Sequence, residues 1–383
     1  MFSKILAHFS AKDAQGETAA MELTAQTVLD AVSTLVDPNT GKPYVAGKAI
    51  KPPRIDAHTL ALDVVLPYPA ASQLDAVRER FEAALAPIAG GRKVEVTARS
   101  QIVSHSVQRG VPLLPGVKNI VVVASGKGGV GKSTTAVNLA LALAAEGARV
   151  GLLDADIYGP SQPLMMGVAD AKPELLEEKG LAPVLSHGVQ VMSIGFLVDP
   201  DQAMVWRGPM VSQALQQLLN DTRWDDLDYL VIDMPPGTGD IQLTLSQKVP
   251  VTGAIVVTTP QDIALLDARK GYTMFQKVGV PVLGLVENMA IHVCSNCGHA
   301  EHIFGEGGAS KMAADFGVEV LGALPLDIRI REAVDAGTPT LVADPDGELA
   351  ATYKAIARKV AVKVGEKAQD FSGRFPKIVI QNG

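Results

Sequence analysis

From residue 118 onward, the chain alternates between short, almost continuous apolar runs and longer stretches with the spacing of amphipathic helices. A strand that is apolar at nearly every position is buried on both faces, as parallel strands are when helices cover both sides of their sheet. This region therefore predicts an α/β fold with a doubly wound, mostly parallel sheet. The predicted strands are NIVVVAS (119–125), VGLLDAD (150–156), VQVMSIG (189–195), YLVIDMP (229–235), GAIVVTT (253–259) and VLGLVEN (282–288).

The chain before residue 118 has a different pattern, which predicts a separate small α+β domain. Its predicted helices cover 21–36 and 72–88, and its predicted strands cover 58–66 and 93–98. Residues 100–117 carry glycines and prolines without periodicity, which is typical of a linker. The expected segments are a small domain over 1–99, a linker over 100–117, a large domain over 118–365 that ends in a helix, and an irregular tail over 366–383.

Composition narrows the class of protein. The chain has 383 residues, 47% of them hydrophobic, which indicates a globular protein, and its net charge is −7. An acidic balance disfavours general binding to nucleic acids or membrane surfaces, because such binding needs an excess of Lys and Arg. Residues 1–17 lack the apolar core of a secretory signal, and no apolar run reaches the 18 or so residues of a membrane span. We therefore expect a cytoplasmic protein that binds neither nucleic acid nor membrane.

The sequence GKGGVGKST follows the first predicted strand of the large domain and precedes a helical pattern. A G-x-x-x-x-G-K-[ST] loop in this context is a P-loop, in which backbone N–H groups and a helix N-terminus bind a triphosphate without a basic surface. Lys132 is expected to act in catalysis by bridging the β- and γ-phosphates, Ser133 to bind Mg²⁺, and Thr134 to contact the α-phosphate. The alternative is a glycine-rich turn that contains a lysine by chance. The predicted nucleotide-binding residues of the loop are Gly126, Lys127, Gly128, Gly129, Val130, Gly131, Lys132, Ser133 and Thr134.

Two further predicted strands end in carboxylates. Asp233 ends YLVID, where it can hold Mg²⁺ at the same sheet edge as the P-loop, and Gly237 follows where its N–H can sense the γ-phosphate. Asp154 and Asp156 end another strand, and we assign Asp156 rather than Asp154 to orient the attacking water. The alternative for each aspartate is a cap of a turn or helix.

Cys294 and Cys297 are the only cysteines, and three of the seven histidines lie within the same eleven-residue stretch, 292–302. In a reducing compartment, C-x-x-C indicates a metal or redox site. A zinc site using His299 and His302 is one interpretation, although its ligands are closer together than in a zinc finger. A thioredoxin-like redox pair is the second. The third is an iron–sulfur cluster shared between two chains, because one chain offers two of the four thiolates that a cluster needs.

A second lysine, Lys127, makes the loop K-G-G-x-G-K-S, which resembles the deviant Walker A loop of MinD/ParA-type ATPases and the nitrogenase iron protein. The resemblance implies that Lys127 acts in catalysis by reaching across a homodimer to the partner's nucleotide. The alternative is a solvated loop lysine. A residue that works only in a dimer agrees with the half-set of cluster ligands.

GKGGVGKST, DADIYGPS, MPPGTGD, ENM and CxxCGHxEHIFGEGG, in this order, resemble the Mrp/ApbC family of iron–sulfur cluster carrier ATPases over about 118–340. The resemblance implies a P-loop NTPase fold, Mg²⁺-dependent ATP hydrolysis, a [4Fe–4S] cluster held by Cys294 and Cys297 of two subunits, and transfer of that cluster to apoproteins. It also implies an adenine contact for Asn288, whose alternative is a turn former at a strand end. The small domain is similar to iron–sulfur assembly factors.

Two departures from the family pattern modify this picture. Ser295 and Asn296 stand where many members have a proline between the cysteines, and 67–72 lacks the cysteine common in the small domain. Cluster binding by the small domain is therefore not expected. The rival hypothesis is a MinD/ParA-like nucleotide switch with structural zinc at the cysteine pair.

Overall fold

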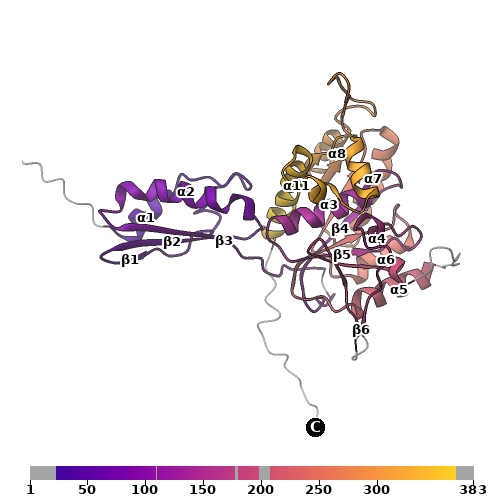
Figure 1. Ribbon diagram of the computed structural model, residues 1–383, viewed down its shortest axis with the longest axis horizontal. Helices are drawn as coiled ribbons and strands as arrows, with labels where there is room; N and C mark the ends of the chain where they lie inside the picture. Colours follow the sequence, from indigo (N-terminus) through magenta and orange to yellow (C-terminus); the bar gives the residue numbers. More distant parts are fainter. Residues whose placement is uncertain (1–22, 109, 177–179, 198–207, 368–383) are drawn as a thin grey trace, which may run out of the picture.

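The computed structural model describes residues 23–108, 110–176, 180–197 and 208–367. They form two domains, with the small one extending sideways from the large one (Figure 1). Two of the segments interpreted above, the N-terminal residues 1–17 and the tail from residue 368, lie outside the described residues. No described helix is long and apolar enough to cross a bilayer.

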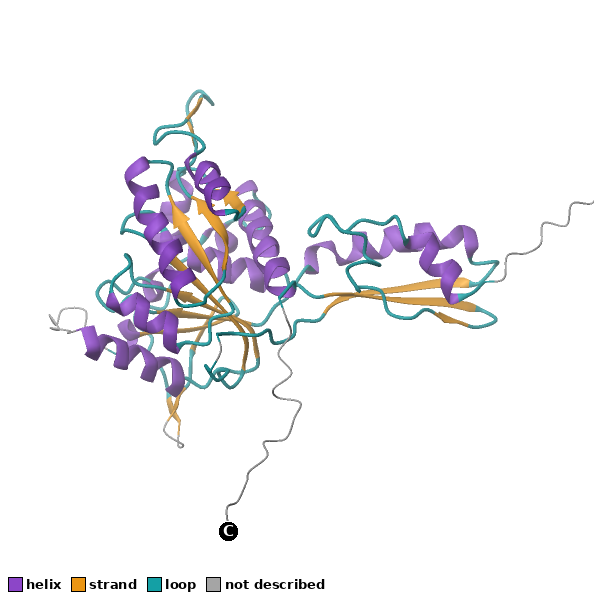
Figure 2. Cartoon of the chain, turned by 180° about the vertical axis from the view of Figure 1, so that it is seen from behind, coloured by secondary structure: helices purple, strands orange, loops and turns teal. Residues whose placement is uncertain are grey.

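The small domain is a three-stranded sheet with two helices on one face (Figure 2). Its strands run β1-β2-β3, with β1 antiparallel to β2 and β2 parallel to β3, since α2 makes the crossover. The rings of Tyr44 and Phe81 meet edge to face in its core, 5.1 Å apart. The first helix is shorter than the predicted 21–36. The elements are α1 Ala25–Val32, β1 Arg54–Ile55, β2 Thr59–Leu66, α2 Leu74–Leu85 and β3 Lys93–Ser100, with short 3₁₀ turns at Ala71–Gln73 and Ala86–Ile88.

The large domain is built on an eight-stranded sheet in the order β15-β12-β11-β4-β10-β5-β9-β8. Every pair is parallel except the edge hairpin of β8 and β9. The strands are β4 Val117–Ser125, β5 Val150–Asp154, β8 Val184–Ser186, β9 Val189–Ser193, β10 Leu227–Asp233, β11 Gly253–Thr258, β12 Val282–Glu287 and β15 Val320–Ala323. Two small hairpins lie outside this sheet: β6 Leu175–Leu176 with β7 Gly180–Leu181, and β13 His292–Val293 with β14 Ala300–Glu301.

Helices cover both faces of this sheet (Figure 2). Strands β5, β10 and β11 are buried at every residue, which confirms the predicted doubly wound α/β fold and its two-sided burial. Helix α11 packs on α3, and α5, α6 and α7 pack in succession. The helices are α3 Lys132–Ala145, α4 Gln162–Met165, α5 Gly208–Asp221, α6 Asp240–Lys248, α7 Asp262–Lys277, α8 Gly308–Phe316, α9 Ile328–Asp335, α10 Thr340–Ala343 and α11 Glu348–Gly365, with a 3₁₀ turn at Ile194–Phe196.

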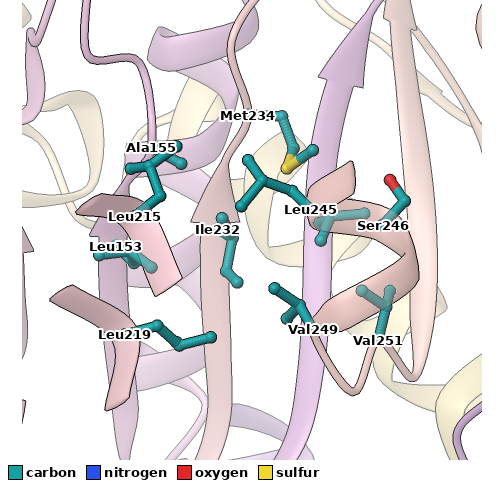
Figure 3. A pocket seen from close by; sticks show the side chains of 11 residues that line it. Leu153, Ala155, Leu215, Leu219, Ile232, Met234, Leu245, Ser246, Val249 and Val251 are labelled. Carbon is teal, nitrogen blue, oxygen red and sulfur yellow. The ribbon is translucent and has the colours of Figure 1, made fainter. Parts of the chain in front are cut away.

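The core between the sheet and helices α5 and α6 is closely filled. Its cavity has a volume of about 10 Å³ and is lined by apolar side chains such as Leu219 and Ile232 (Figure 3). That is room for about one water molecule, and the lining offers few polar partners. This cavity is therefore a packing gap rather than a ligand site.

The two domains meet at the C-terminal end of α3. Glu146 is 1% exposed and accepts hydrogen bonds from the backbone N–H and hydroxyl of Ser72 and from the guanidinium of Arg358. Its carbonyl also accepts from the N–H of Ala71 at 3.0 Å. The helix that starts at the P-loop therefore ends against the small domain.

Candidate functional site

The P-loop lies between β4, at the centre of the sheet, and α3. Gly129 and Gly131 have φ angles of +80° and +79°. Residues with a side chain rarely adopt such angles, so the loop needs glycine at both positions. A Cβ atom on Gly126 would collide with the backbone of Asp267. A side chain at the end of β4 also fixes the loop, because the Ser125 hydroxyl donates a hydrogen bond to the Lys127 carbonyl at 2.8 Å. The backbone thus has the tight curvature that a phosphate-binding loop requires.

Lys132 and Asp233, predicted to act on phosphate and Mg²⁺, contact each other. The Lys132 ammonium forms a buried ion pair with Asp233 Oδ1 and lies 3.1 Å from the Ser133 hydroxyl. The register of the strands explains this meeting, since Asp233 is at the carboxyl end of β10, next to β4. The side chains of Lys132 and Asp233 are 6% and 0% exposed. The structure thus brings together the lysine, hydroxyl and carboxylate that the sequence placed at one sheet edge.

Gln162, which sequence reasoning missed, completes this network. Its amide donates to Asp233 Oδ2 at 2.9 Å and to the Ser133 carbonyl at 3.1 Å. Gln162 begins α4, directly after the DADIYGPS motif, and is fully buried. The only signal in the sequence was that position, because a glutamine has no chemistry that marks it as part of a site.

Asp154 and Asp156 have different environments. Asp154 is fully buried and accepts hydrogen bonds from the N–H groups of Asp156, Ser161 and Gln162. Burial, with the nearby Asp233 charge, raises the pKa of Asp154 to about 7. Asp156 is half-buried, and its pKa is raised mainly by burial, while Lys132 opposes the shift. Asp154 therefore shapes the loop, and the assignment of the attacking water to Asp156 stays a prediction.

Gly237 and Asn288 lie beside the P-loop but have protein partners. The Gly237 N–H donates to the Ser125 carbonyl at 3.0 Å, so it contacts β4 rather than open space. The Asn288 amide, at the end of β12, donates to the Val130 carbonyl at 2.9 Å. Asn288 thus braces the loop, and its adenine contact stays a prediction. Lys127 is half-buried, and its action across a dimer is likewise a prediction.

The two cysteines lie at the tip of the β13–β14 hairpin, which projects from the large domain above α8 (Figure 1). The Cys294 N–H donates to the His299 carbonyl, and the Gly298 N–H donates to the Cys294 carbonyl, which closes the turn. Both thiols are free, and Cys297 is exposed. Backbone N–H groups of Asn296 and Cys297 hydrogen-bond the Cys294 sulfur and lower the pKa of its thiol. These are the properties of a thiolate ligand that faces outward.

Two of the histidines near the cysteines make hydrogen bonds to backbone carbonyls. Nδ1 of His292 lies 2.9 Å from the Leu326 carbonyl, and Nδ1 of His302 lies 2.7 Å from the Ala290 carbonyl. A hydrogen bond at Nδ1 fixes the ring and leaves its Nε2 atom open. Within the described ranges, no three His, Cys, Asp or Glu side chains are arranged to hold a metal ion. The zinc interpretation thus lacks a complete ligand set within one chain.

Comparisons with known proteins match both domains. A family model described as a NUBPL iron-transfer P-loop NTPase matches residues 116–361, and an iron–sulfur cluster assembly protein model matches residues 25–98. An iron–sulfur cluster carrier protein from Pseudomonas fragi is 62% identical over 278 residues, which cover 72% of this chain and 97% of the relative. The mouse iron–sulfur cluster transfer protein NUBPL is 53% identical over 264 residues, covering 68% and 82% of the two chains.

A solved structure is also similar to the large domain. It is a nucleotide-binding protein from Archaeoglobus fulgidus in complex with ADP, 37% identical, with a TM-score of 0.54, and the match covers 62% of this chain and 93% of that one. The family model spans more than half of the chain, and the carrier proteins share more than half of the aligned residues. On these grounds the chain belongs to the Mrp/ApbC/NUBPL family of iron–sulfur cluster carrier P-loop NTPases.

Proposed function

We propose that this protein is a Mg²⁺-dependent ATPase that carries a [4Fe–4S] cluster at a homodimer interface and transfers it to apoproteins. The observation that carries the proposal is the buried contact of Lys132 with Ser133 and Asp233 at the P-loop, together with two free thiols on a projecting hairpin of the same domain. ATP, Mg²⁺ and the cluster are the groups that such a protein handles.

The residues at the P-loop suit Mg²⁺. Asp233 and Ser133 offer hard oxygen donors, which Mg²⁺ prefers, and the buried carboxylate already balances a cation, the Lys132 ammonium. Mg²⁺ bound there would neutralise negative charge on the phosphates. When ATP binds, Lys132 leaves Asp233 and contacts the β- and γ-phosphates. Asp156 orients the attacking water, and Lys127 stabilises the transition-state charge at the partner's nucleotide.

The cluster needs two chains. A [4Fe–4S] cluster takes about four thiolates, whereas one chain supplies Cys294 and Cys297. A second chain, related by a two-fold axis beside the exposed hairpin, would supply the other two thiolates. The exposure of Cys297 supports a ligand set that is completed from outside the chain, and it also leaves the cluster accessible to recipient apoproteins.

The second candidate is a MinD/ParA-like nucleotide switch with structural zinc at the cysteine pair. The P-loop would serve both functions equally well, so only the cysteine hairpin separates them. Among the described residues, no three His, Cys, Asp or Glu side chains are grouped to hold a metal ion, which disfavours a zinc site formed within one chain.

Anaerobic reconstitution followed by iron, sulfide and zinc analysis tests the proposal. A cluster carrier should hold about four irons and four sulfides per two chains. Ser133→Ala should abolish Mg²⁺-dependent hydrolysis and cluster transfer while leaving cluster binding intact. Thr352→Ala, on the exposed side of α11, is the matched hydroxyl control and should turn over normally. One zinc per chain without sulfide would replace this proposal with the nucleotide switch.

A further inference from the structure

Gln162 is a buried side chain from outside the P-loop that connects the loop with the carboxylate at the end of β10. Both of its amide hydrogens are used, one by Asp233 Oδ2 and one by the Ser133 carbonyl. The opposite orientation of the amide would place its oxygen against the Asp233 carboxylate and leave both acceptors without a donor. The direction in which the amide points is therefore fixed by its neighbours.

The Asp233 carboxylate is shared between two donors. Lys132 holds Oδ1 and Gln162 holds Oδ2, and the carboxylate itself is fully buried. When Lys132 moves to the phosphates of a nucleotide, it takes its positive charge away from Oδ1. A buried carboxylate that loses a partner costs free energy unless other donors remain. Gln162 is the donor that remains, because it bonds the other carboxylate oxygen, Oδ2, and does not move with Lys132.

The carbonyl oxygen of the same amide has no donor. Gln162 Oε1 is buried and lacks a hydrogen-bond partner among the described residues. Buried polar atoms are rarely left this way, so the oxygen marks a position that a bound group or an ordered water fills. This unpartnered acceptor is an independent sign that Gln162 can take a further partner beside Asp233.

We propose that Gln162 is a positioning residue for Asp233: it anchors Oδ2 to the P-loop through Ser133, so that Oδ1 keeps facing the nucleotide site after Lys132 has left it. The inference rests on the proposed function, because it assumes that the P-loop binds Mg²⁺ and nucleotide. It adds a residue outside the P-loop and strand-end motifs whose task is to keep Asp233 oriented during the exchange of partners.

The test compares nucleotide affinity with and without Mg²⁺ in the full-length chain. Gln162→Met keeps the length of the side chain but removes both donors. Its ADP affinity in excess Mg²⁺ should fall roughly 10- to 100-fold, as expected for hydrogen bonds to a charged group, while its affinity in EDTA changes little. A purely structural role would lower both affinities equally or neither.

Three other variants make the test decisive. Gln162→Asn keeps the amide but cannot reach both acceptors, so its Mg²⁺ effect should lie between those of wild type and Gln162→Met. Gln162→Glu places a second carboxylate beside Asp233 and should lower the Mg²⁺-dependent affinity and also the urea midpoint of the nucleotide-free protein. Gln190→Met is the matched control, since Gln190, near the start of β9, also makes two hydrogen bonds, both with the backbone of Asp225.

The outcomes separate the two proposals. If wild type fails to bind ADP in Mg²⁺, the proposed function is wrong. If wild type binds ADP with a clear Mg²⁺ dependence and Gln162→Met and Gln162→Asn keep the same dependence within about threefold, the role assigned to Gln162 is wrong. Selective loss in the Gln162 variants, with Gln190→Met unchanged, supports the inference.

Discussion

The buried ion pair of Lys132 and Asp233 predicts a large loss of stability when one partner is removed. Lys132→Met leaves the Asp233 carboxylate, 0% exposed, with the Gln162 amide as its remaining side-chain donor. Removing one partner of a buried pair costs about 3–5 kcal/mol, because the other charge is left uncompensated. Lys132→Met combined with Asp233→Asn removes both charges of the pair, so most of the lost stability should return. The unfolding free energies of the two single variants and the double variant should therefore give a coupling energy of at least about 2 kcal/mol.

Urea-induced unfolding of the nucleotide-free protein measures the four free energies of this cycle. The pair formed by Lys270 and Asp267 is the matched control, because its atoms are 2.9 Å apart but its side chains are 67% and 27% exposed. An exposed pair of this kind should couple by less than about 1 kcal/mol. A coupling between Lys132 and Asp233 no larger than that of the control would show that the two charges do not balance each other, and the reasoning would be refuted.

Three further predictions concern the cysteine hairpin, a buried carboxyl and the P-loop glycines. Cys294→Ala should abolish the visible absorption of the reconstituted cluster but leave ADP affinity unchanged; a variant that keeps the absorption would remove Cys294 from the ligand set. The pKa of Asp154, raised to about 7 from 3.8, means that the folded state holds this proton more tightly, so wild type should lose stability relative to Asp154→Asn as the pH rises from about 4 to 7. A pH-independent difference in unfolding free energy would contradict this. Gly131→Ala should lower the unfolding free energy by about 1–3 kcal/mol and weaken ADP binding, because φ is +79° and the new Cβ meets the Asn288 amide. Gly128→Ala, whose new Cβ would meet open space, should keep an unfolding free energy near that of wild type. An equal loss of unfolding free energy in the two variants would argue against backbone strain at Gly131.

Much of the fold was predictable because burial leaves a strong pattern. The central strands of the large domain are buried at every residue because helices cover both faces, and apolar side chains fill most of these positions. The first helix was predicted less well, since it ends at Val32 rather than at residue 36. Less predictable was the direction of the edge strand β8 Val184–Ser186, which pairs antiparallel with β9. Only three residues long, it carries no periodicity that would reveal its direction.

The candidate site was predictable where its chemistry depends on a local motif. The P-loop and Asp233 could be paired from sequence because parallel strands end at one sheet edge. Gln162 could not, since its role comes from its neighbours in space. Asn288 was assigned to adenine through a resemblance, whereas its amide is used to support Val130. Hydrogen-bond partners of this kind depend on the folded arrangement and leave no mark in the order of residues.

Native mass spectrometry of the anaerobically reconstituted protein tests the central claim most directly, because it reports the number of chains and the number of irons in one particle. The account predicts a dimer that carries four irons and four sulfides, and Cys297→Ala should yield apoprotein instead. A single chain that holds a complete metal site through Cys294 and Cys297 would contradict it.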